Sequence, residues 1–227
     1  MIECIIFDLD DTLFEEVEYC KSGFRKIAAV LAEKTNVASI QEFYDAFWYQ
    51  FKSGNPKTIF NSVLDQFNID YDGNYIRRLI EIYRSHLPTI TLPDDSRKVL
   101  DHLHLHSKIA LLSDGFLPAQ RLKLQALGIE HYFQCIVLTE ELGRDYWKPS
   151  PVGFRKIVEE LDVSNGNCVY VGDNLTKDFI APNQLGFRSI QLKRPNKLHN
   201  DPPATIEGKP EFVIKSINVL PSLLKKL

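Results

Sequence analysis

Acidic residues follow directly after a short apolar run near the beginning of the sequence. Residues 4–7 are apolar, and Asp8 and Asp10 come next, two positions apart. In an extended chain, side chains two positions apart point to the same side, so both carboxylates would face one ligand. One carboxylate could attack a phosphorus atom covalently, while the other gives and takes protons at the oxygen beyond it. The pair therefore predicts nucleophilic and acid–base chemistry at a phosphate.

Further polar residues stand where other predicted strands end, or just before a predicted helix. They are Ser113 and Asp114, Asp173 with nearby Asp178, and Lys148. Carboxylates that converge on one point repel each other and need a cation. A set of oxygen ligands favours Mg²⁺, and a lysine, a hydroxyl group and backbone N–H groups can hold a phosphate. These residue types predict phosphoryl transfer at a magnesium site.

The elements that must position these residues alternate between strands and helices. The predicted strands are residues 3–7, 108–112, 135–138, 167–171, 189–192 and 212–214. Their nearly continuous apolar character is typical of parallel strands buried on both faces. Helices are predicted between them, among them residues 176–185, which end at Gly186. The pattern predicts an α/β fold with a Rossmann-like parallel-sheet core, whose ligands bind beyond the carboxyl ends of the strands.

Residues 15–87 have a different pattern. Apolar residues recur there at helical spacing, as at Phe24, Ile27 and Leu31, and predict about four helices. Pro88 and Pro93 disfavour helix in the residues before them and mark the return to the sheet. We therefore expect a core formed by residues 1–14 and 88–227, and a small inserted helical cap formed by residues 15–87.

Taken together, the motifs resemble those of the haloacid dehalogenase superfamily. The resemblance is carried by four segments in family order: Asp8-Leu9-Asp10-Asp11-Thr12, Ser113, Lys148-Pro149, and Gly172-Asp173 with Asp178. The helical insert is similar to the cap that the family places between its first two motifs. Residues 120–133 also resemble its nucleotidase and sugar-phosphatase branch.

The resemblance implies catalytic roles for three residues. Asp8 would be the nucleophile and a metal ligand. Asp10 would be the general acid and base, and its backbone carbonyl would also bind the metal. Lys148 would stabilise the phosphate and the nucleophile.

It also implies a phosphate site and a magnesium site. Ser113 and the N–H of Asp114 would hold the phosphate, although the branch often has Asn at position 114 and the carboxylate adds negative charge there. Asp173 would bind Mg²⁺, and Asp178 would reach the metal through water or orient Lys148. Residues 143–147 are bulkier than is usual before the lysine, and we expect them to shape the mouth of the pocket or a partner surface.

The expected function is hydrolysis of small phosphomonoesters, either nucleoside monophosphates or sugar phosphates, through an aspartyl-phosphate. The expected partner is thus a small phosphorylated metabolite. Three alternatives remain open at this point. A sugar phosphomutase would also use Asp10, a 2-haloacid dehalogenase would need neither metal nor second acid, and a non-catalytic regulator would only bind phosphate ligands.

Composition excludes other classes. The formal net charge is −3, and the basic cluster Lys193-Arg194 with Lys197 is interpreted as a solvated loop, so we expect no nucleic acid polymer as partner. No apolar run approaches the roughly 20 residues that span a bilayer, so we expect no membrane. The four cysteines form no CxxC pair, which fits a reducing cytoplasm. We expect a soluble cytoplasmic protein, monomeric or homodimeric.

Overall fold

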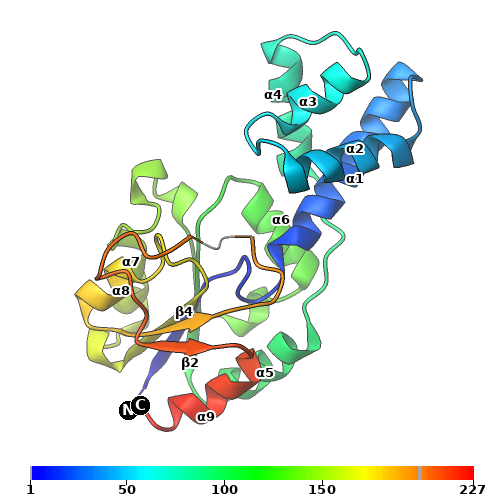
Figure 1. Cartoon of the computed structure of the whole chain (residues 1–227). Coiled ribbons are helices and arrows are strands. Elements are labelled where there is room, and N and C mark those ends of the chain that lie inside the picture. The colour runs from blue at the N-terminus through cyan, green and yellow to red at the C-terminus, as the bar shows by residue number, and fades with distance from the viewer. Residues whose placement is uncertain (1, 199–200) are drawn as a thin grey trace. The chain divides into compact units, whose positions relative to one another are not determined.

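A computed structural model describes residues 2–198 and 201–227, and the chain divides into two compact units (Figure 1). The core unit contains Met1–Val17, Thr91–Phe116 and Leu124–Leu227. The helical unit contains Glu18–Ile90 and Leu117–Lys123.

The core unit is built on a six-stranded sheet in which every neighbouring pair is parallel. The strands are β1 (Cys4–Phe7), β2 (Lys108–Ser113), β3 (Cys135–Leu138), β4 (Cys168–Gly172), β5 (Arg188–Leu192) and β6 (Phe212–Ile214). Their order is β3-β2-β1-β4-β5-β6. All six lie where the sequence predicts strands, and the predicted α/β fold with a parallel sheet is confirmed.

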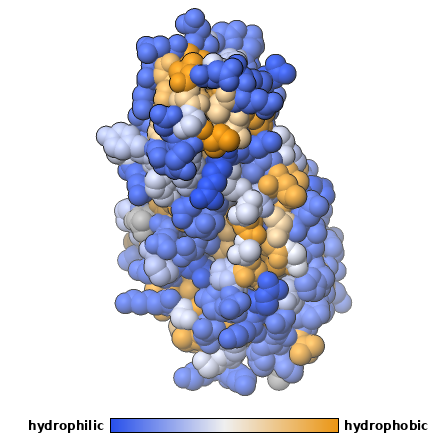
Figure 2. Space-filling view, turned by 90° about the vertical axis from the view of Figure 1, so that its right-hand side faces the viewer, coloured by the Kyte–Doolittle hydropathy of each residue, from blue (hydrophilic) through white to orange (hydrophobic). Residues whose placement is uncertain are grey.

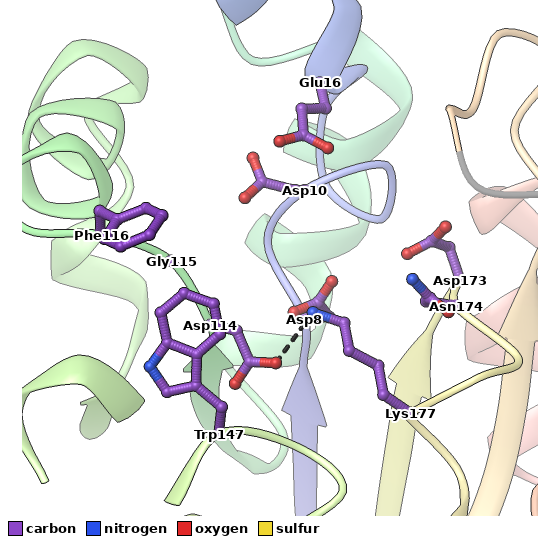
Figure 3. A pocket seen from close by; sticks show the side chains of 10 residues that line it. All are labelled: Asp8, Asp10, Glu16, Asp114, Gly115, Phe116, Trp147, Asp173, Asn174 and Lys177. Carbon is purple, nitrogen blue, oxygen red and sulfur yellow. Dashed lines mark hydrogen bonds and ion pairs between the residues drawn. The ribbon is translucent and has the colours of Figure 1, made fainter. Parts of the chain in front are cut away.

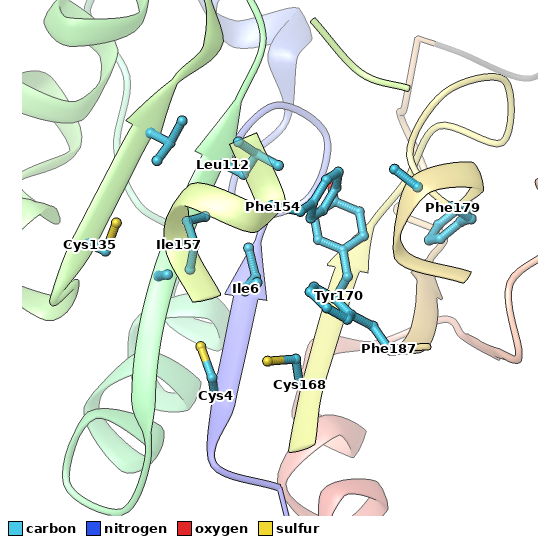
Figure 4. Packing of buried hydrophobic residues seen from close by; sticks show 13 residues of the cluster. Cys4, Ile6, Leu112, Cys135, Phe154, Ile157, Cys168, Tyr170, Phe179 and Phe187 are labelled. Carbon is cyan, nitrogen blue, oxygen red and sulfur yellow. The ribbon is translucent and has the colours of Figure 1, made fainter. Parts of the chain in front are cut away.

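Helices cover both faces of this sheet. They are α5 (Asp94–His104), α7 (Val152–Leu161), α8 (Ile180–Leu185) and α9 (Leu220–Leu224). Helix α6 (Ala119–Leu127) begins in the helical unit and ends in the core unit. Cys4 and Ile6 face the layer of α7 and α8, where they pack in one apolar cluster with Phe154 and Phe179 (Figure 4). Side chains alternate along a strand, so Ile5 points to the opposite face. The strands are thus buried on both sides, as their apolar runs indicated.

Helix α8 begins four residues later than the predicted start at residue 176. The backbone N–H of Asn174 donates to Asp178 Oδ2 at 2.8 Å, and that of Thr176 donates to Asn174 Oδ1 at 3.0 Å. Side chains that bind nearby backbone N–H groups compete with helix formation. The residues before Ile180 therefore form turns closed on these two side chains, which the apolar pattern could not indicate.

The helical unit has its own apolar interior. Its helices are α1 (Glu16–Thr35), whose first two residues belong to the core unit, α2 (Ile40–Ser53), α3 (Ile59–Gln66) and α4 (Gly73–Ser85). The rings of Phe24 and Phe47 stack with centroids 5.6 Å apart, and those of Phe43 and Phe67 lie 4.5 Å apart. Ser39 and Glu42 form a reciprocal capping box at the start of α2.

The helical unit begins and ends three residues later than the cap expected at residues 15–87, and it also includes a second segment. Leu117–Lys123, which the sequence placed in the core, groups with the helical unit. Lys123 is almost completely buried, and its ammonium lies 4.3 Å from the centroid of the Tyr19 ring. This cation–π contact joins segments that are far apart in the chain.

The visible surface is mostly hydrophilic, with apolar side chains in small groups (Figure 2). Among the described residues, every helix is too short or too polar to cross a bilayer.

Candidate active site

The loops that carry the predicted site residues leave three neighbouring strands. Asp8 follows β1, Ser113 ends β2, and Asp173 follows β4, while β1 lies between β2 and β4 in the sheet. The carboxyl ends of parallel strands meet at one edge, so these loops are adjacent. They surround a cavity of about 240 Å³ within the core unit (Figure 3). Its lining residues are Asp8, Asp10, Glu16, Asp114, Gly115, Phe116, Trp147, Asp173, Asn174 and Lys177.

Lys148 lies beneath this cavity with its side chain fully enclosed. Its Nζ is 2.6 Å from Asp8 Oδ1, 2.8 Å from Asp178 Oδ1 and 2.9 Å from the hydroxyl of Tyr170. Burial alone would lower the pKa of Lys148, but the carboxylates of Asp178 and Asp8 outweigh it and raise that pKa well above its usual value. Tyr170 was not predicted as a site residue, because it lies in the apolar run of β4.

Three carboxylates converge beside this lysine. Oxygens of Asp8, Asp173 and Asp178 all lie within 4.8 Å of one another. Burial raises the pKa of Asp8 to about 7, with Lys148 opposing it, and burial and the charges of Asp178 and Asp8 raise the pKa of Asp173 to about 9. Asp173 Oδ2 is buried and has no hydrogen-bond partner among the described residues. An all-oxygen donor set with an unpartnered buried oxygen fits Mg²⁺.

Asp178 differs from the other two carboxylates because one of its oxygens binds two backbone N–H groups, while the other has an ion pair with Lys148 but no hydrogen bond among the described residues. Oδ2 accepts from the backbone N–H groups of Asp173 and Asn174, at 3.1 and 2.8 Å. Oδ1 faces the ammonium of Lys148. Asp178 therefore fixes the loop that carries Asp173 and positions Lys148. Asp10 lies outside the carboxylate cluster but lines the cavity, on the loop above Asp8 (Figure 3).

Gly172 has no side chain, and the carboxylate of Asp178 occupies the space where one would lie. A Cβ at this position would lie 2.6 Å from Asp178 Oδ2 and 2.9 Å from the ring of Tyr170. We expect Gly172→Ala to lower the free energy of unfolding by about 1–3 kcal/mol, since added volume in a packed interior forces neighbours apart. Chemical denaturation measures this change, with Gly166→Ala as the control, because nothing lies within 4 Å of its Cβ position. Equal stability of both variants would contradict this account.

Asp114 is held on one side by neutral donors and on the other by a cation. Its Oδ1 accepts from Thr139 Oγ1 at 2.8 Å and from the backbone N–H of Lys148 at 3.1 Å. Its Oδ2 pairs with Lys177 Nζ at 2.8 Å. Burial by itself would raise the pKa of Asp114, but Lys148 and Lys177 outweigh it, and the pKa is lowered. The preceding Ser113 is buried at the end of β2. Lys177 was not predicted as a site residue, because its position falls within the helix predicted at residues 176–185.

The loop after β1 is fixed by Asp11 and Arg194. Asp11 has a positive φ of 53°, and its carboxylate accepts from the backbone N–H groups of Glu16 at 2.9 Å and Leu198 at 2.6 Å. Arg194 Nε donates to the carbonyl of Thr12 at 2.8 Å, and its side chain is only 9% exposed. The interpretation of residues 193–197 as a solvated loop is therefore wrong for Arg194, which is an internal support of the loop between Asp10 and the helical unit.

Replacing Arg194 tests this support. We expect Arg194→Gln to lower the turnover number about 10-fold, because small displacements of reacting groups are costly. It should also destabilise the protein by about 1–2 kcal/mol through loss of the hydrogen bonds to loop carbonyls. Steady-state kinetics and thermal unfolding measure the two effects. Lys193→Gln changes the exposed neighbouring residue and is the control; the same losses in both variants would contradict a specific role for Arg194.

Aromatic residues line one side of the cavity. The rings of Phe116 and Trp147 meet edge to face with centroids 5.5 Å apart, and the guanidinium of Arg144 lies 4.4 Å from the Phe116 centroid. The indole N–H of Trp147 donates to Glu140 at 2.9 Å. The bulky segment before Lys148 thus contributes Trp147 to the cavity wall, one of the two positions expected for it.

Comparison with known proteins identifies a family and several relatives. A model of the family described as haloacid dehalogenase-like hydrolase matches residues 2–186. The chain is 25% identical to glyceraldehyde 3-phosphate phosphatase of Methanopyrus kandleri, with 100% of this chain and 99% of that protein covered. It is 24% identical to N-acylneuraminate-9-phosphatase of Mus musculus, with 100% and 95% covered.

Among solved structures, the fold is similar to that of the putative HAD-hydrolase YfnB from Bacillus subtilis, which was solved bound to magnesium. The TM-score is 0.69 at 19% sequence identity, with 98% of each chain covered. At this identity, the likeness describes the fold alone.

Proposed function

Because the chain belongs to the haloacid dehalogenase-like hydrolase family, we propose that it is a magnesium-dependent phosphatase of small phosphomonoesters. The observation that supports this most directly is the position of Asp8. It lies at the carboxyl end of β1, 2.6 Å from the ammonium of Lys148 and beside the unpartnered oxygen of Asp173. A nucleophile and an open oxygen ligand thus share one cavity, and an enclosed ammonium group is paired with the nucleophile.

Asp8, Asp173 and the backbone carbonyl of Asp10 are the groups proposed to hold Mg²⁺. Asp178 supports them from behind, since its oxygens are already engaged by Lys148 and by two backbone N–H groups. When bound, the ion would neutralise charge on the phosphate oxygens and on the converging carboxylates.

The proposed reaction has two displacements at phosphorus. Asp8 attacks the phosphorus, the bond to the alcohol oxygen breaks, and Asp10 gives that oxygen a proton. Asp10 then takes a proton from water, whose oxygen attacks the phosphorus and breaks the bond to Asp8. Inorganic phosphate leaves and both carboxylates are restored. The hydroxyl of Ser113 and the backbone N–H of Asp114 are proposed to hold the phosphate.

Sugar phosphates or nucleoside monophosphates are the proposed substrates. Two phosphatases similar to this chain are named for a triose phosphate and a phosphorylated acylneuraminate. The cavity of about 240 Å³ is smaller than the roughly 300–1,000 Å³ of sites that enclose whole ligands, so it suits the phosphate group alone. Residues outside the cavity would then determine which alcohol part of the phosphate ester is accepted. A monomer or homodimer in the cytoplasm remains our proposal. The four cysteines are buried and form no disulfide among the described residues, which agrees with a reducing compartment.

A panel of phosphorylated sugars and nucleoside monophosphates tests this function. We expect phosphate release from at least one ester with Mg²⁺ and none after chelation by EDTA, with activity restored by added Mg²⁺. Transfer of phosphate between isomers without release would instead indicate a mutase. Halide release from a 2-haloacid without metal would indicate a dehalogenase, and binding without turnover would indicate a regulator.

A further inference from the structure

Lys177 is a second lysine at the cavity, besides the buried Lys148. Its side chain extends from the loop after β4 to Asp114, where Nζ lies 2.8 Å from Oδ2 (Figure 3). The side chain of Lys177 keeps 32% of its surface exposed, whereas that of Lys148 keeps none. A ligand in the cavity can therefore reach the ammonium of Lys177 directly.

Lys148 is fully enclosed and already engaged by three groups. Its ammonium donates hydrogen bonds to Asp8 and to the hydroxyl of Tyr170, and it forms an ion pair with Asp178 at 2.8 Å, although Asp178 Oδ1 has no hydrogen bond among the described residues. A ligand in the cavity therefore has less access to Lys148 than to Lys177. Lys177 is different, because Asp114 is the hydrogen-bond partner of its ammonium among the described residues.

Asp114 explains why a second cation is needed at this position. Its other oxygen accepts from two neutral donors, the hydroxyl of Thr139 and the backbone N–H of Lys148. A carboxylate next to a bound phosphate would repel it unless a cation balanced the charge. Lys177 supplies that charge at the place where the carboxylate meets the cavity.

We propose that Lys177 is a phosphate-binding residue held in place by Asp114, an inference that rests on the proposed phosphatase function. The N–H groups of Lys177 that Asp114 does not use donate to a non-bridging phosphate oxygen. Asp114 holds the ammonium across the cavity, and the pair adds no net charge. The carboxylate at position 114 and the lysine at position 177 therefore act as one unit in phosphate recognition.

Four variants test the unit: Lys177→Met, Lys177→Arg, Asp114→Asn and the double variant Lys177→Met/Asp114→Asn. The readouts are the dissociation constant of inorganic phosphate, by ³¹P NMR titration with Mg²⁺ present, and KM and kcat for p-nitrophenyl phosphate. Lys98→Met is the matched control, because Lys98 is exposed on α5, outside the cavity. Asp114→Asn keeps the acceptor for Thr139 and the N–H of Lys148.

We expect Lys177→Met to weaken phosphate binding about 10- to 100-fold, the usual effect of losing a hydrogen bond to a charged group. KM should rise by a similar factor, with a smaller fall in kcat, and Lys177→Arg should keep most of the affinity. Asp114→Asn should bind phosphate more tightly than Lys177→Met, because it keeps the ammonium and removes a negative charge. The double variant should bind phosphate better than Lys177→Met, since no unbalanced carboxylate remains.

Two results would overturn the inference. Phosphate binding by Lys177→Met that equals that of the Lys98→Met control would show that the ammonium does not contact phosphate. Equal weakening by Lys177→Met and Asp114→Asn, with no recovery in the double variant, would show a purely structural ion pair. Phosphate titration needs no turnover, so failure of the ester panel would reject the phosphatase function separately, while normal hydrolysis with unchanged phosphate binding would reject Lys177 alone.

Discussion

Replacement of Asp8 by Asn is expected to lower phosphoester hydrolysis at least about 10³-fold, because the nucleophile of a covalent mechanism is lost. Asn has nearly the same shape but no carboxylate to attack phosphorus. The loss should appear in kcat, measured with the best ester of the substrate panel. Asp65→Asn, on the exposed side of α3, is the control for the same chemical change away from the site.

The Asp8→Asn protein should remain folded, which separates this result from a loss of structure. Burial raises the pKa of Asp8 to about 7, so its charge is costly in the metal-free protein. Lys148 would still pair with Asp178. The free energy of unfolding without metal should therefore be equal to or higher than that of the wild type. Full hydrolytic activity in this variant would end the case for Asp8 as nucleophile.

Replacement of Lys148 by Met is the second change with a large expected effect, and it should act on stability as well as activity. The variant leaves Asp8 and Asp178 buried without their shared cation. Removing one partner of a buried ion pair typically costs about 3–5 kcal/mol. Hydrolysis should fall with it, because Lys148 also holds the nucleophile. Denaturant unfolding in the presence of EDTA measures the stability of the metal-free protein.

The stability deficit of Lys148→Met should depend on pH in a defined direction. The pKa of Asp8 is already raised by burial, and loss of Lys148 removes the main group that lowers it. A carboxyl group with a raised pKa in the folded state favours folding when protonated, so its destabilising effect grows as pH rises. The deficit should therefore be smaller near pH 5 than near pH 8. A deficit that is constant across this range would contradict the electrostatic cause.

A double variant, Lys148→Met with Asp178→Asn, serves as the control. It removes one of the two carboxylates that Lys148 balances, so part of the lost stability should return. Hydrolysis should stay low, because the ammonium beside Asp8 is still missing. If the double variant were less stable than Lys148→Met alone, packing rather than charge would explain the role of this lysine.

The fold could be predicted well because each strand is recognisable from the residues of its own short segment. Six short apolar runs lie at the six strands of the sheet, since strands buried on both faces need apolar residues at every position. The same logic brought Asp8, Asp173 and Ser113 to one edge of the sheet, because parallel strands end together. Lys148 lies on no strand, and its place beside Asp8 was implied only by the resemblance to a family.

The contacts that the sequence could not predict all join side chains across loops. In the sequence, Tyr170 is one residue of an apolar strand, and this pattern does not predict a polar contact. Its hydroxyl accepts a hydrogen bond from Lys148, which lies far away in sequence. In the sequence, Arg194 is one of several neighbouring cations that were expected to be exposed. Its guanidinium instead donates to the carbonyl of Thr12, which is 182 positions away in sequence. Lys177 lies in a segment whose apolar pattern predicts a helix, and that pattern does not predict an ion pair with Asp114.

The central position of β1 also bears on the order in which the protein can be completed during synthesis. β1 is the first of the described strands, yet its neighbours β2 and β4 pair with it through residues 108–111 and 168–171. While residues 18–90 leave the ribosome, their aromatic interior can already assemble from contacts near in sequence, such as that between Phe43 and Phe67. The strand that ends in Asp8 gains its first partner, β2, only when about half of the polypeptide exists, and its second partner, β4, when about three quarters exist. The catalytic centre is thus among the last parts to form, and a truncated product lacking β4 would leave one edge of β1 unpaired.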